Sequence, residues 1–468
     1  MTPILGIIAS SISGYLSSYF VGYLSGTAAA ASQSDLAPAI ATDSSKNMYV
    51  AGTYKNSSGF LICYVAKFNA SGTLQWQREN YILSNSSLNF NDALAVDSSG
   101  NVYVGGMHAN GTATGAFLIK YNSSGTLQWQ RSLQNPASGN NARIYRIAID
   151  SSGNPYAVGE YYSIQTPYSE REPFVVKYNS SGVLQWQRYL SNKAGSAANE
   201  SGYGIAVDSS ANVYITGLHV FTASANQMAF IAKYNSSGTL QWQRWDYIST
   251  SAQDVFYCAA VDSSGNIYVA GRQLNAAGSG YIGTISKYNS SGTVQWRRTL
   301  TSPNVSAWQY LQFKGIAVDS SANVYVISAD QNIAQTGNFA TYIFKYNTSG
   351  TIQWQRRFID SYTVPGNAQN NNIVVDSGND LLITSGMKNS SGGINAFIAR
   401  IPNDGSKTGT YVIDASHTIT YGTPSYTDAA STSTESAATA TDFAGTIVDS
   451  AGAATDAAGP LTTANVGI

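Results

Sequence analysis

The histidines and carboxylates that could do chemistry in this chain of 468 residues are few, and they form no recognisable cluster. His108 and His219 occupy equivalent positions in two copies of a repeated motif, with Tyr161 at the same place in the copy between them. A catalytic or structural zinc site takes three or four such ligands in fixed geometry, and no third ligand accompanies these histidines. We therefore expect no metal site and no cofactor.

A catalytic site is equally difficult to assemble from the sequence. Glycoside hydrolysis needs two carboxylates about 5–10 Å apart; Glu160, Glu170, Glu172 and Asp330 are available, but their spacing selects no pair. No nucleophile motif or phosphate-binding loop occurs. We expect a protein that has no catalytic residues and is not an enzyme, with a glycan-active enzyme as the remaining alternative.

Aromatic side chains with nearby carboxylates and amides lie in irregular segments between the regular motifs. Amphipathic rings beside polar groups are typical of sugar-binding surfaces, and variable loops on a constant frame commonly carry function. The alternative, that these rings only pack the loops, stays open. The candidate ligand-binding residues are Tyr161, Tyr162, Tyr168, Phe221, Trp245, Tyr247 and Trp308.

Two short motifs alternate along most of the chain and must position these segments. The first reads KYNSSGTLQWQR at residues 233–244, and the second reads AVDSSGNVYVGG at residues 95–106. Self-similarity at a fixed period indicates a repeat architecture. The first motif carries the tryptophans Trp76, Trp129, Trp186, Trp242, Trp296 and Trp354, and the second carries the aspartates Asp43, Asp97, Asp150, Asp208, Asp262, Asp319 and Asp376.

Each motif predicts a β-hairpin. Apolar runs flank Asp-Ser-Ser-Gly or Asn-Ser-Ser-Gly, in which the first side chain accepts backbone N–H groups and glycine adopts a positive φ. Ala211, Ala322 and Asn379 replace that glycine, and each alanine is expected to carry about 1 kcal/mol of strain. All of these turns are expected on one face of the molecule, with the variable loops on the other. The repeated lysines and arginines are expected to blunt the sheet edges.

One repeat is therefore four short antiparallel strands, and seven repeats predict an all-β, seven-bladed β-propeller. The six tryptophans are predicted to be structural residues that wedge between neighbouring blades. The motifs resemble the bacterial SBBP β-propeller repeat, and the Gly-x-x-x-Trp spacing is similar to the docking motif of quinoprotein propellers. The resemblance covers residues 38–413. Blade seven is degenerate, with residues 407–413 in place of its tryptophan strand, and needs no strand from the N-terminus.

The composition limits the classes of partner. Charged residues make up 11% and the net charge is −1, with no basic stripe, so nucleic-acid binding is not expected. Cys63 and Cys258 fall in different blades, so two buried free thiols are expected.

Residues 1–26 are uncharged and apolar, and small residues recur at every fourth position. On a helix these residues would form a smooth stripe that permits close helix packing. We expect a helical anchoring or assembly segment, while a signal peptide and a membrane span remain open. Residues 27–37 are the expected linker. The candidate assembly residues are Gly6, Ser10, Gly14, Ser18 and Gly22.

The opening residues 2–14, TPILGIIASSISG, resemble the start of virion structural and tail-fibre proteins of tailed phages, marine ones especially. The resemblance implies a non-enzymatic structural and adhesive virion protein, such as an appendage, fibre or decoration. Its expected partners are other virion proteins, copies of itself, and a host-surface glycan or protein, with membrane contact left open. A secreted or surface-anchored bacterial propeller that binds glycan or protein is the alternative.

Residues 414–468 change to Ala, Thr, Ser, Asp and Gly, without a period of 2 or 3.6. We expect a low-complexity C-terminal arm, either flexible or ordered by a neighbouring subunit.

Overall fold

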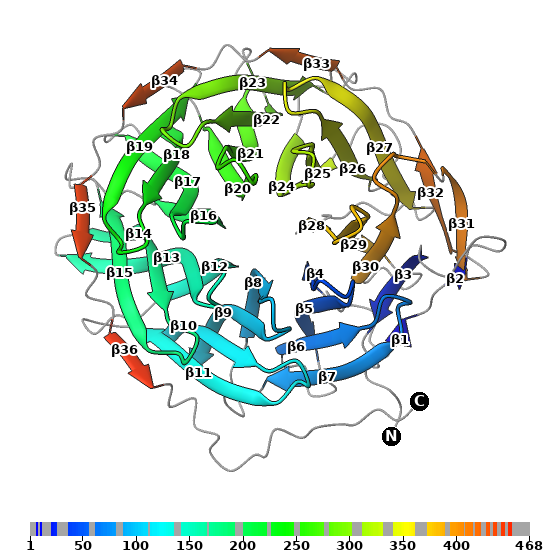
Figure 1. Cartoon of the computed structure of the whole chain (residues 1–468), viewed down its shortest axis with the longest axis horizontal. Coiled ribbons are helices and arrows are strands. Elements are labelled where there is room, and N and C mark those ends of the chain that lie inside the picture. The colour runs from blue at the N-terminus through cyan, green and yellow to red at the C-terminus, as the bar shows by residue number, and fades with distance from the viewer. Residues whose placement is uncertain are drawn as a thin grey trace.

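The computed structural model describes residues 6–7, 10–11, 20–25, 36–55, 61–80, 88–110, 113–134, 142–165, 168–191, 200–221, 226–247, 253–275, 280–301, 311–330, 340–360, 372–388, 394–406, 408–414, 417–422, 427–430, 434–437, 441–444 and 448–451. These residues form strands and turns and no helix. The strands build seven antiparallel sheets around a central axis, as Figure 1 shows. The predicted seven-bladed β-propeller of four-stranded blades is confirmed.

Blades one to six each take four consecutive strands, the first nearest the axis and the fourth outermost (Figure 1). Their innermost strands are β4 (Leu36–Thr42), β8 (Leu88–Val96), β12 (Ala142–Ile149), β16 (Ser201–Val207), β20 (Val255–Val261) and β24 (Leu311–Val318). The second strands are β5 (Met48–Lys55), β9 (Val102–Asn110), β13 (Pro155–Gln165), β17 (Val213–Phe221), β21 (Ile267–Leu274) and β25 (Val324–Asp330).

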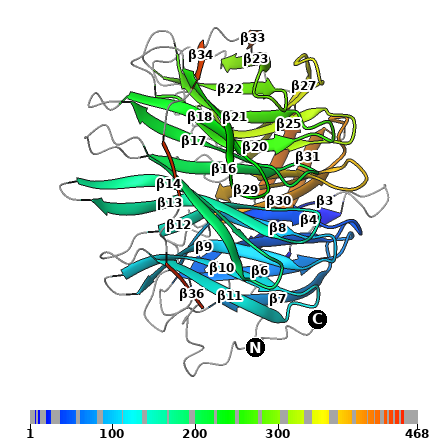
Figure 2. The ribbon, with the colours of Figure 1, turned by 60° about the vertical axis from the view of Figure 1, so that its left-hand side comes forward.

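The third and fourth strands complete these blades. The third strands are β6 (Leu61–Phe68), β10 (Ala113–Tyr121), β14 (Tyr168–Tyr178), β18 (Asn226–Tyr234), β22 (Tyr281–Tyr288) and β26 (Ala340–Tyr346). The fourth strands are β7 (Leu74–Asn80), β11 (Leu127–Gln134), β15 (Leu184–Ser191), β19 (Leu240–Tyr247), β23 (Val294–Thr301) and β27 (Ile352–Asp360). The hairpin of β13 and β14 projects beyond its neighbours in Figure 2.

Blade seven takes its outer strand from the beginning of the chain. Strands β28 (Asn372–Val375), β29 (Leu381–Lys388) and β30 (Ile394–Ile401) are followed outward by β3 (Phe20–Ser25). Two short strands, β1 (Gly6–Ile7) and β2 (Ser10–Ser11), pair with β3. The expectation that blade seven closes without an N-terminal strand is therefore wrong, and the ring is closed by both ends of the propeller sequence.

The helix expected over residues 1–26 is also wrong for the described part of that segment, which forms these three strands. Glycine costs about 1 kcal/mol relative to alanine inside a helix, and this segment is rich in glycine and serine. The outer edge of β30 would otherwise leave its backbone groups unpaired. Sheet pairing therefore outweighs a weak helical preference.

Residues 407–413 do not supply the missing strand of blade seven. Strand β31 (Gly409–Asp414) pairs instead with β32 (His417–Gly422), which adds to the outer edge of β27 in blade six. The chain thus leaves blade seven after its third strand and turns back along the circumference.

The C-terminal arm continues in this reverse direction and adds one strand to each blade it passes (Figure 1). Strands β33 (Thr427–Ala430), β34 (Thr434–Ala437), β35 (Thr441–Ala444) and β36 (Val448–Ala451) pair with β23, β19, β15 and β11. The described part of the arm is therefore ordered by the chain's own blades, an arrangement that neither earlier alternative included.

The arm has a constant register. Ala430, Ala437, Ala444 and Ala451 lie opposite Arg298, Arg244, Arg188 and Arg131, in blades five, four, three and two. Each arginine stands two positions after the tryptophan of its blade. The arm therefore advances one blade for every seven residues.

In each turn that begins with a repeated aspartate, several hydrogen bonds converge on that one carboxylate. Asp319 accepts the backbone N–H groups of Ser321 and Asn323, both at 2.9 Å, and the Tyr325 hydroxyl at 2.8 Å. The expected left-handed residues are confirmed, with φ values of 60° at Ala211, 58° at Ala322 and 66° at Asn379. The two turns of a blade lie together on one face, as predicted: an added Cβ at Gly265 would lie 3.7 Å from Cβ of Ser290.

The repeated tryptophans connect consecutive blades. Trp186 donates its indole N–H to the carbonyl oxygen of Ser236 at 3.0 Å, and its ring covers Gly238, where an added Cβ would lie 2.6 Å away. The same contact is made from Trp76 to Ser123, Trp129 to Ser180, Trp242 to Ser290, Trp296 to Thr348 and Trp354 to Asn403. The six tryptophans therefore have the predicted structural role.

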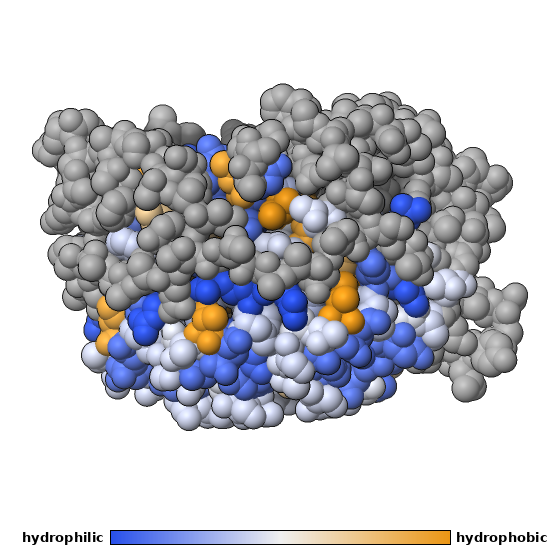
Figure 3. All heavy atoms as spheres, turned by 90° about the horizontal axis from the view of Figure 1, so that it is seen from above, coloured by the Kyte–Doolittle hydropathy of each residue, from blue (hydrophilic) through white to orange (hydrophobic). Residues whose placement is uncertain are grey.

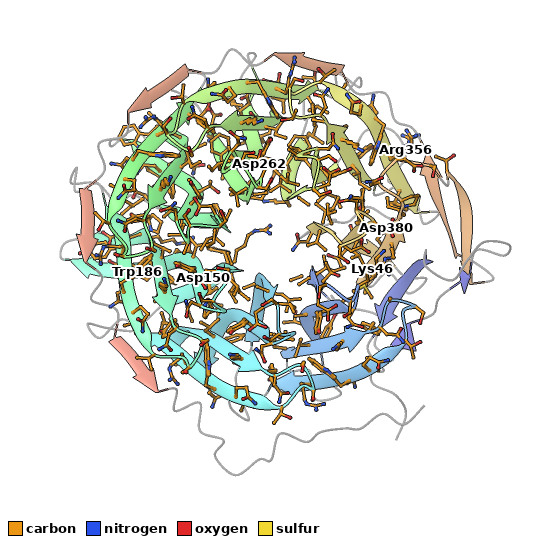
Figure 4. The ribbon with its side chains drawn as sticks, in the orientation of Figure 1. Lys46, Asp150, Trp186, Asp262, Arg356 and Asp380 are labelled. Carbon is orange, nitrogen blue, oxygen red and sulfur yellow. The ribbon has the colours of Figure 1, made fainter. Side chains whose placement is uncertain are left out.

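The repeated lysines and arginines are not the edge-blunting pattern that the sequence suggested. Lys233 donates to the carbonyl oxygen of Ser290 in the next blade at 3.1 Å, and Arg356 donates to that of Gly405 at 2.6 Å. Figure 4 shows Trp186 and Arg356 near the circumference, whereas Asp150 and Asp262 lie closer to the axis. These cations help to join blades because a turn carbonyl at the blade junction needs a donor.

The described interior is apolar and the described surface is polar. Cys63 and Cys258 are buried free thiols, as predicted, and burial raises the pKa of the Cys258 thiol to about 12. Figure 3 shows hydrophilic residues over most of the coloured surface, with isolated hydrophobic patches. In the described ranges no helix has the length and apolar character needed to cross a membrane.

Candidate ligand-binding site

The innermost strands of blades three to six share an irregular position. Register shifts occur between Ile144 and Arg146, Gly202 and Gly204, Phe256 and Cys258, and Phe313 and Gly315. The residues at these β-bulges are Tyr145, Tyr203, Tyr257 and Lys314, each five positions before the turn aspartate of its blade. A bulge redirects a side chain out of the regular pleat, so four blades present a large polar or aromatic side chain at equivalent places near the axis.

The three tyrosines form a continuous aromatic row across three blades. The ring centroids of Tyr145 and Tyr203 are 4.9 Å apart with an interplanar angle of 63°. Those of Tyr203 and Tyr257 are 5.4 Å apart with an angle of 48°. Edge-to-face and tilted pairs at these separations are favourable, so the row is a pre-arranged surface.

Cationic side chains lie against this row. Lys314 Nζ is 3.2 Å from the Tyr257 ring centroid, and Arg272 Cζ is 5.8 Å from the same centroid. Arg272 also lies 4.0 Å from the centroid of Tyr281, so its guanidinium is held between two rings. Arg143 Cζ lies 5.9 Å from the ring of Tyr145. We refer to Arg143, Tyr145, Tyr203, Tyr257, Arg272 and Lys314 as the inner cluster.

One carboxylate, Glu160, adjoins the inner cluster and is neutralised by arginines. Its Oε1 lies 3.2 Å from Arg143 Nε and 3.6 Å from Arg171 Nη1, and its Oε2 accepts the Ser201 hydroxyl. Arg272 Nε is buried and has no hydrogen-bond partner among the residues that the structure describes. The described charge around the cluster is therefore predominantly positive.

The environment keeps the tyrosines protonated. Burial raises the pKa values of Tyr145 and Tyr203, with Glu160 adding to the effect. Burial raises the pKa of Tyr257 to about 12, although the Arg272 cation opposes the shift. The phenols of the cluster therefore remain hydroxyl groups that can donate hydrogen bonds near neutral pH.

Arg146 makes a contact between two distant blades. It stands on β12 of blade three and donates from Nη2 to the carbonyl oxygen of Lys314 on β24 of blade six. The contact joins the two ends of the row of bulges and adds a further positive charge beside it.

Two of the seven predicted ligand-binding residues have described side chains, and both are buried. Tyr161 is 7% exposed, donates to Glu172 and packs on Tyr189 at 5.6 Å. Trp245 is 5% exposed and stacks on His219 at 4.8 Å. Both rings pack within blades in this structure, which agrees with the packing interpretation that the sequence left open.

The other five predicted residues lie outside the described side chains. Tyr162, Tyr168, Phe221 and Tyr247 belong to β13, β14, β17 and β19, and Trp308 lies outside the described residues altogether. A ligand-binding role for these residues stays a prediction.

The candidate metal and catalytic residues are not gathered into a site. His219 is buried, with Nδ1 2.5 Å from Glu200 Oε1, and the side chain of His108 lies outside the described residues. Burial raises the pKa of Glu200 against the opposing effect of His219. No group of three or more potential metal ligands occurs in the described parts of the chain.

Sequence reasoning missed the inner cluster, although a signal was present. The position five residues before each turn aspartate changes from blade to blade, and in blades three to six it carries a large polar or aromatic side chain. In chain order it is occupied by Pro38, Asp92, Tyr145, Tyr203, Tyr257, Lys314 and Asn371. Large side chains that differ between repeats on a constant frame indicate a candidate contact surface.

Comparisons with known proteins agree with this architecture. A sequence family described as outer membrane protein assembly factor BamB matches residues 118–391, which is more than half of the chain. No match is found among curated proteins.

Several solved structures resemble the chain at low identity. An ulvan lyase of polysaccharide lyase family PL25, bound to a glucuronate–sulfated rhamnose unit, is 10% identical, with 79% of this chain and 93% of that chain covered and a TM-score of 0.48. The β-propeller domain of the Trilobed protease from Pyrococcus furiosus is 11% identical, with 79% and 98% covered and a TM-score of 0.43. A protein of unknown function from Bacteroides caccae is 13% identical, with 62% and 89% covered and a TM-score of 0.35. Because these scores are below 0.5, function must be inferred from the chain's own residues.

Proposed function

The chain belongs to the family described as outer membrane protein assembly factor BamB, and from that premise we propose that it is a non-enzymatic structural and adhesive protein. In this proposal it is displayed on a tailed-phage particle, as an appendage, fibre or decoration, and its propeller contacts a host-surface glycan or protein. The printed family name describes an assembly factor, which agrees with a role in contact rather than in chemistry.

The inner cluster is the observation that carries the proposal. It combines aromatic rings, cations and protonated phenols, and four of its six residues occupy the bulge position of blades three to six. The adjoining carboxylate, Glu160, lies close to two arginines and accepts the Ser201 hydroxyl. A rigid frame with such a surface is suited to binding.

The pairing of strand β3 favours the proposal that residues 1–26 are retained in the mature protein. Strand β3 pairs with β30 along five residue pairs and completes blade seven. Removal of a signal peptide near Ala30 would remove this strand and expose the edge of β30. Retention of residues 1–26 leaves the beginning of the chain available for attachment to a particle.

The test is the location and the N-terminus of the native protein. Purified phage particles are digested and analysed by mass spectrometry, and the native protein is expected in them with its first residue at position 1 or 2. In parallel, the purified protein is expected to co-sediment with host cells. Absence from particles, or a native start near Ala30, would contradict the virion assignment; failure to co-sediment would contradict the adhesive one.

A secreted or surface-anchored bacterial propeller that binds glycan or protein is a second candidate. The family name refers to the outer membrane, which favours a location at a bacterial surface. Cell fractionation distinguishes the two, because this candidate requires the protein in the envelope or medium of uninfected bacteria.

A further inference from the structure

We propose that the inner cluster binds an acidic saccharide, one whose sugar units carry carboxylate or sulfate groups. The inference rests on the proposed adhesive function and names the class of ligand that the propeller contacts. It concerns residues of four neighbouring blades and not the variable loops considered from the sequence.

The charge of the cluster selects an anion. Arg143, Arg146, Arg171, Arg272 and Lys314 come together from blades three, five and six, and Glu160 is the one carboxylate that the described ion pairs place among them. Asp254, a buried carboxylate of blade five, accepts the backbone N–H of Leu274 at 3.0 Å. The whole chain has a net charge of −1, so this positive concentration is local.

Arg272 is the strongest single indication. Its guanidinium lies between the rings of Tyr257 and Tyr281, at 5.8 Å and 4.0 Å from their centroids, and it forms no ion pair among the described residues. Its Nε is a buried donor that lacks a described acceptor. A buried donor without an acceptor is costly, and a carboxylate or sulfate oxygen would satisfy it with a charge-assisted hydrogen bond.

The tyrosines distinguish a saccharide from a simple anion. The row from Tyr145 through Tyr203 to Tyr257 is joined by ring contacts at 4.9 Å and 5.4 Å, so it is long enough to meet more than one small group. All three phenols stay protonated because burial raises their pKa values. Ring edges and hydroxyl donors suit the alternating C–H and hydroxyl groups of sugar rings.

Isothermal titration calorimetry on the full chain tests the proposal. Trigalacturonic acid is the acidic probe, maltotriose the neutral saccharide, inorganic phosphate the simple anion and a short polyglutamate peptide the acidic non-saccharide. Trigalacturonic acid is expected to bind, with affinity that falls as salt is added, and the other three are expected to bind at least about tenfold more weakly.

Variants then locate the site. Arg272→Gln is expected to weaken trigalacturonate binding by about tenfold or more, since one charge-assisted pair is lost. Tyr257→Phe, which removes only a hydroxyl, is expected to weaken it by about fivefold. Arg357→Gln on the outer strand β27 is the matched control and is expected to bind as the native chain does. Thermal midpoints confirm that each variant is folded.

Each contrary result has a distinct meaning. Equal binding of maltotriose, phosphate or polyglutamate overturns the ligand class, and unchanged binding by folded Arg272→Gln and Tyr257→Phe chains overturns the location. If no probe binds while the chain still co-sediments with host cells, the acidic-saccharide inference fails and the adhesive function stands. If co-sedimentation fails but trigalacturonate binds through Arg272, the adhesive function fails and the site remains.

Discussion

At the scale of single residues, the fold depends on its tight turns. In these turns the carboxylate of the first residue, an aspartate, accepts hydrogen bonds from backbone N–H groups that would otherwise need a backbone partner. The repeated turn aspartates each accept from several donors, and where glycine ends the turn it adopts a positive φ without strain. Two alanines hold the same conformation, at Ala211 and Ala322. The same turn therefore occurs in this chain in two versions, one with an unstrained glycine and one with a strained alanine at the left-handed position.

Relieving that strain should stabilise the protein. Ala211→Gly is expected to raise the free energy of unfolding by about 0.5–1 kcal/mol, because a left-handed alanine costs about 1–2 kcal/mol and glycine recovers part of it as chain entropy. Gly265→Ala is the reverse change, at φ 79° and with no close contact for the added Cβ; it should lower the free energy by a similar amount. Urea denaturation measures both, and equal stability of the two variants would contradict the interpretation.

The turn carboxylates should also make the free energy of unfolding decrease at acidic pH. Burial alone would raise the pKa of Asp319, but hydrogen bonds from Asn323, Tyr325 and Ser321 outweigh it and hold the pKa below its usual value. Because the pKa is lower in the folded state, ionised Asp319 stabilises the fold at pH values above the unfolded pKa of about 3.9. This stabilisation is lost as the pH falls from there through the folded-state pKa.

Asp319→Asn tests this dependence. The variant is expected to be less stable by about 2 kcal/mol at pH 7, since charge-assisted hydrogen bonds are lost. The difference from the native chain should shrink as the pH is lowered below about 4. Urea denaturation at a series of pH values measures it, and a difference independent of pH would show that the carboxylate charge is not used.

At the scale of the elements, the sequence predicts the hairpins formed by neighbouring residues, but it does not predict strand pairing between residues far apart in the chain. The hairpins follow from Asp and Asn turns, and the tryptophan contacts follow from a constant offset in every blade. By contrast, the pairing of β3 with β30 joins residues at opposite ends of the propeller sequence. No local property of residues 20–25 identifies a partner, so the glycine and serine spacing was interpreted as a helix.

The arm was missed for a related reason. Four-residue strands are too short to show the alternation that predicts a strand, and their partners are far away in the sequence. A signal was nevertheless present, because Thr427–Ala430, Thr434–Ala437 and Thr441–Ala444 share the pattern Thr-acidic-x-Ala at a spacing of seven. The inner cluster had a comparable signal in the changing residue before each turn aspartate.

Removing the N-terminal strand should loosen blade seven. A chain lacking residues 1–30 is expected to lose hydrogen-exchange protection at the amides of β30 that face β3, because their partners are gone. A peptide of residues 18–26 added in trans should restore it by strand addition. A chain lacking only residues 1–5, which precede β1, is the control. Full protection of Ile394–Ile401 in the shortened chain would contradict the pairing.

At the scale of the whole molecule, the N-terminal strand and the C-terminal arm both pair with outer strands of the blades. The beginning completes blade seven, and the arm covers the outer edges of blades six to two. Unpaired sheet edges promote association between molecules, so this covering disfavours edge-to-edge association of the covered blades. Within the described residues, the outer edge of β7 in blade one has no such strand.

The register of the arm makes a prediction for that edge. Residues 455–458, which lie outside the described residues, read Thr-Asp-Ala-Ala and continue the seven-residue spacing. Continuation of the same spacing would bring Ala458 opposite Arg78, which stands two positions after Trp76. A chain ending at Ala451 is therefore expected to lose hydrogen-exchange protection in β7 but not in β11. Unchanged exchange in β7 would show that the arm ends at blade two.

The constant step of the arm couples the number of blades to the length of the C-terminal segment, two quantities that usually vary independently in repeat proteins. Repeat proteins gain and lose units readily, since each unit contacts only its neighbours. Here the described arm advances one blade for every seven residues from blade five to blade two, so a duplication of one of these blades would leave the arm one step short of blade two. A change in the number of these blades therefore requires a matching change in the length of the arm.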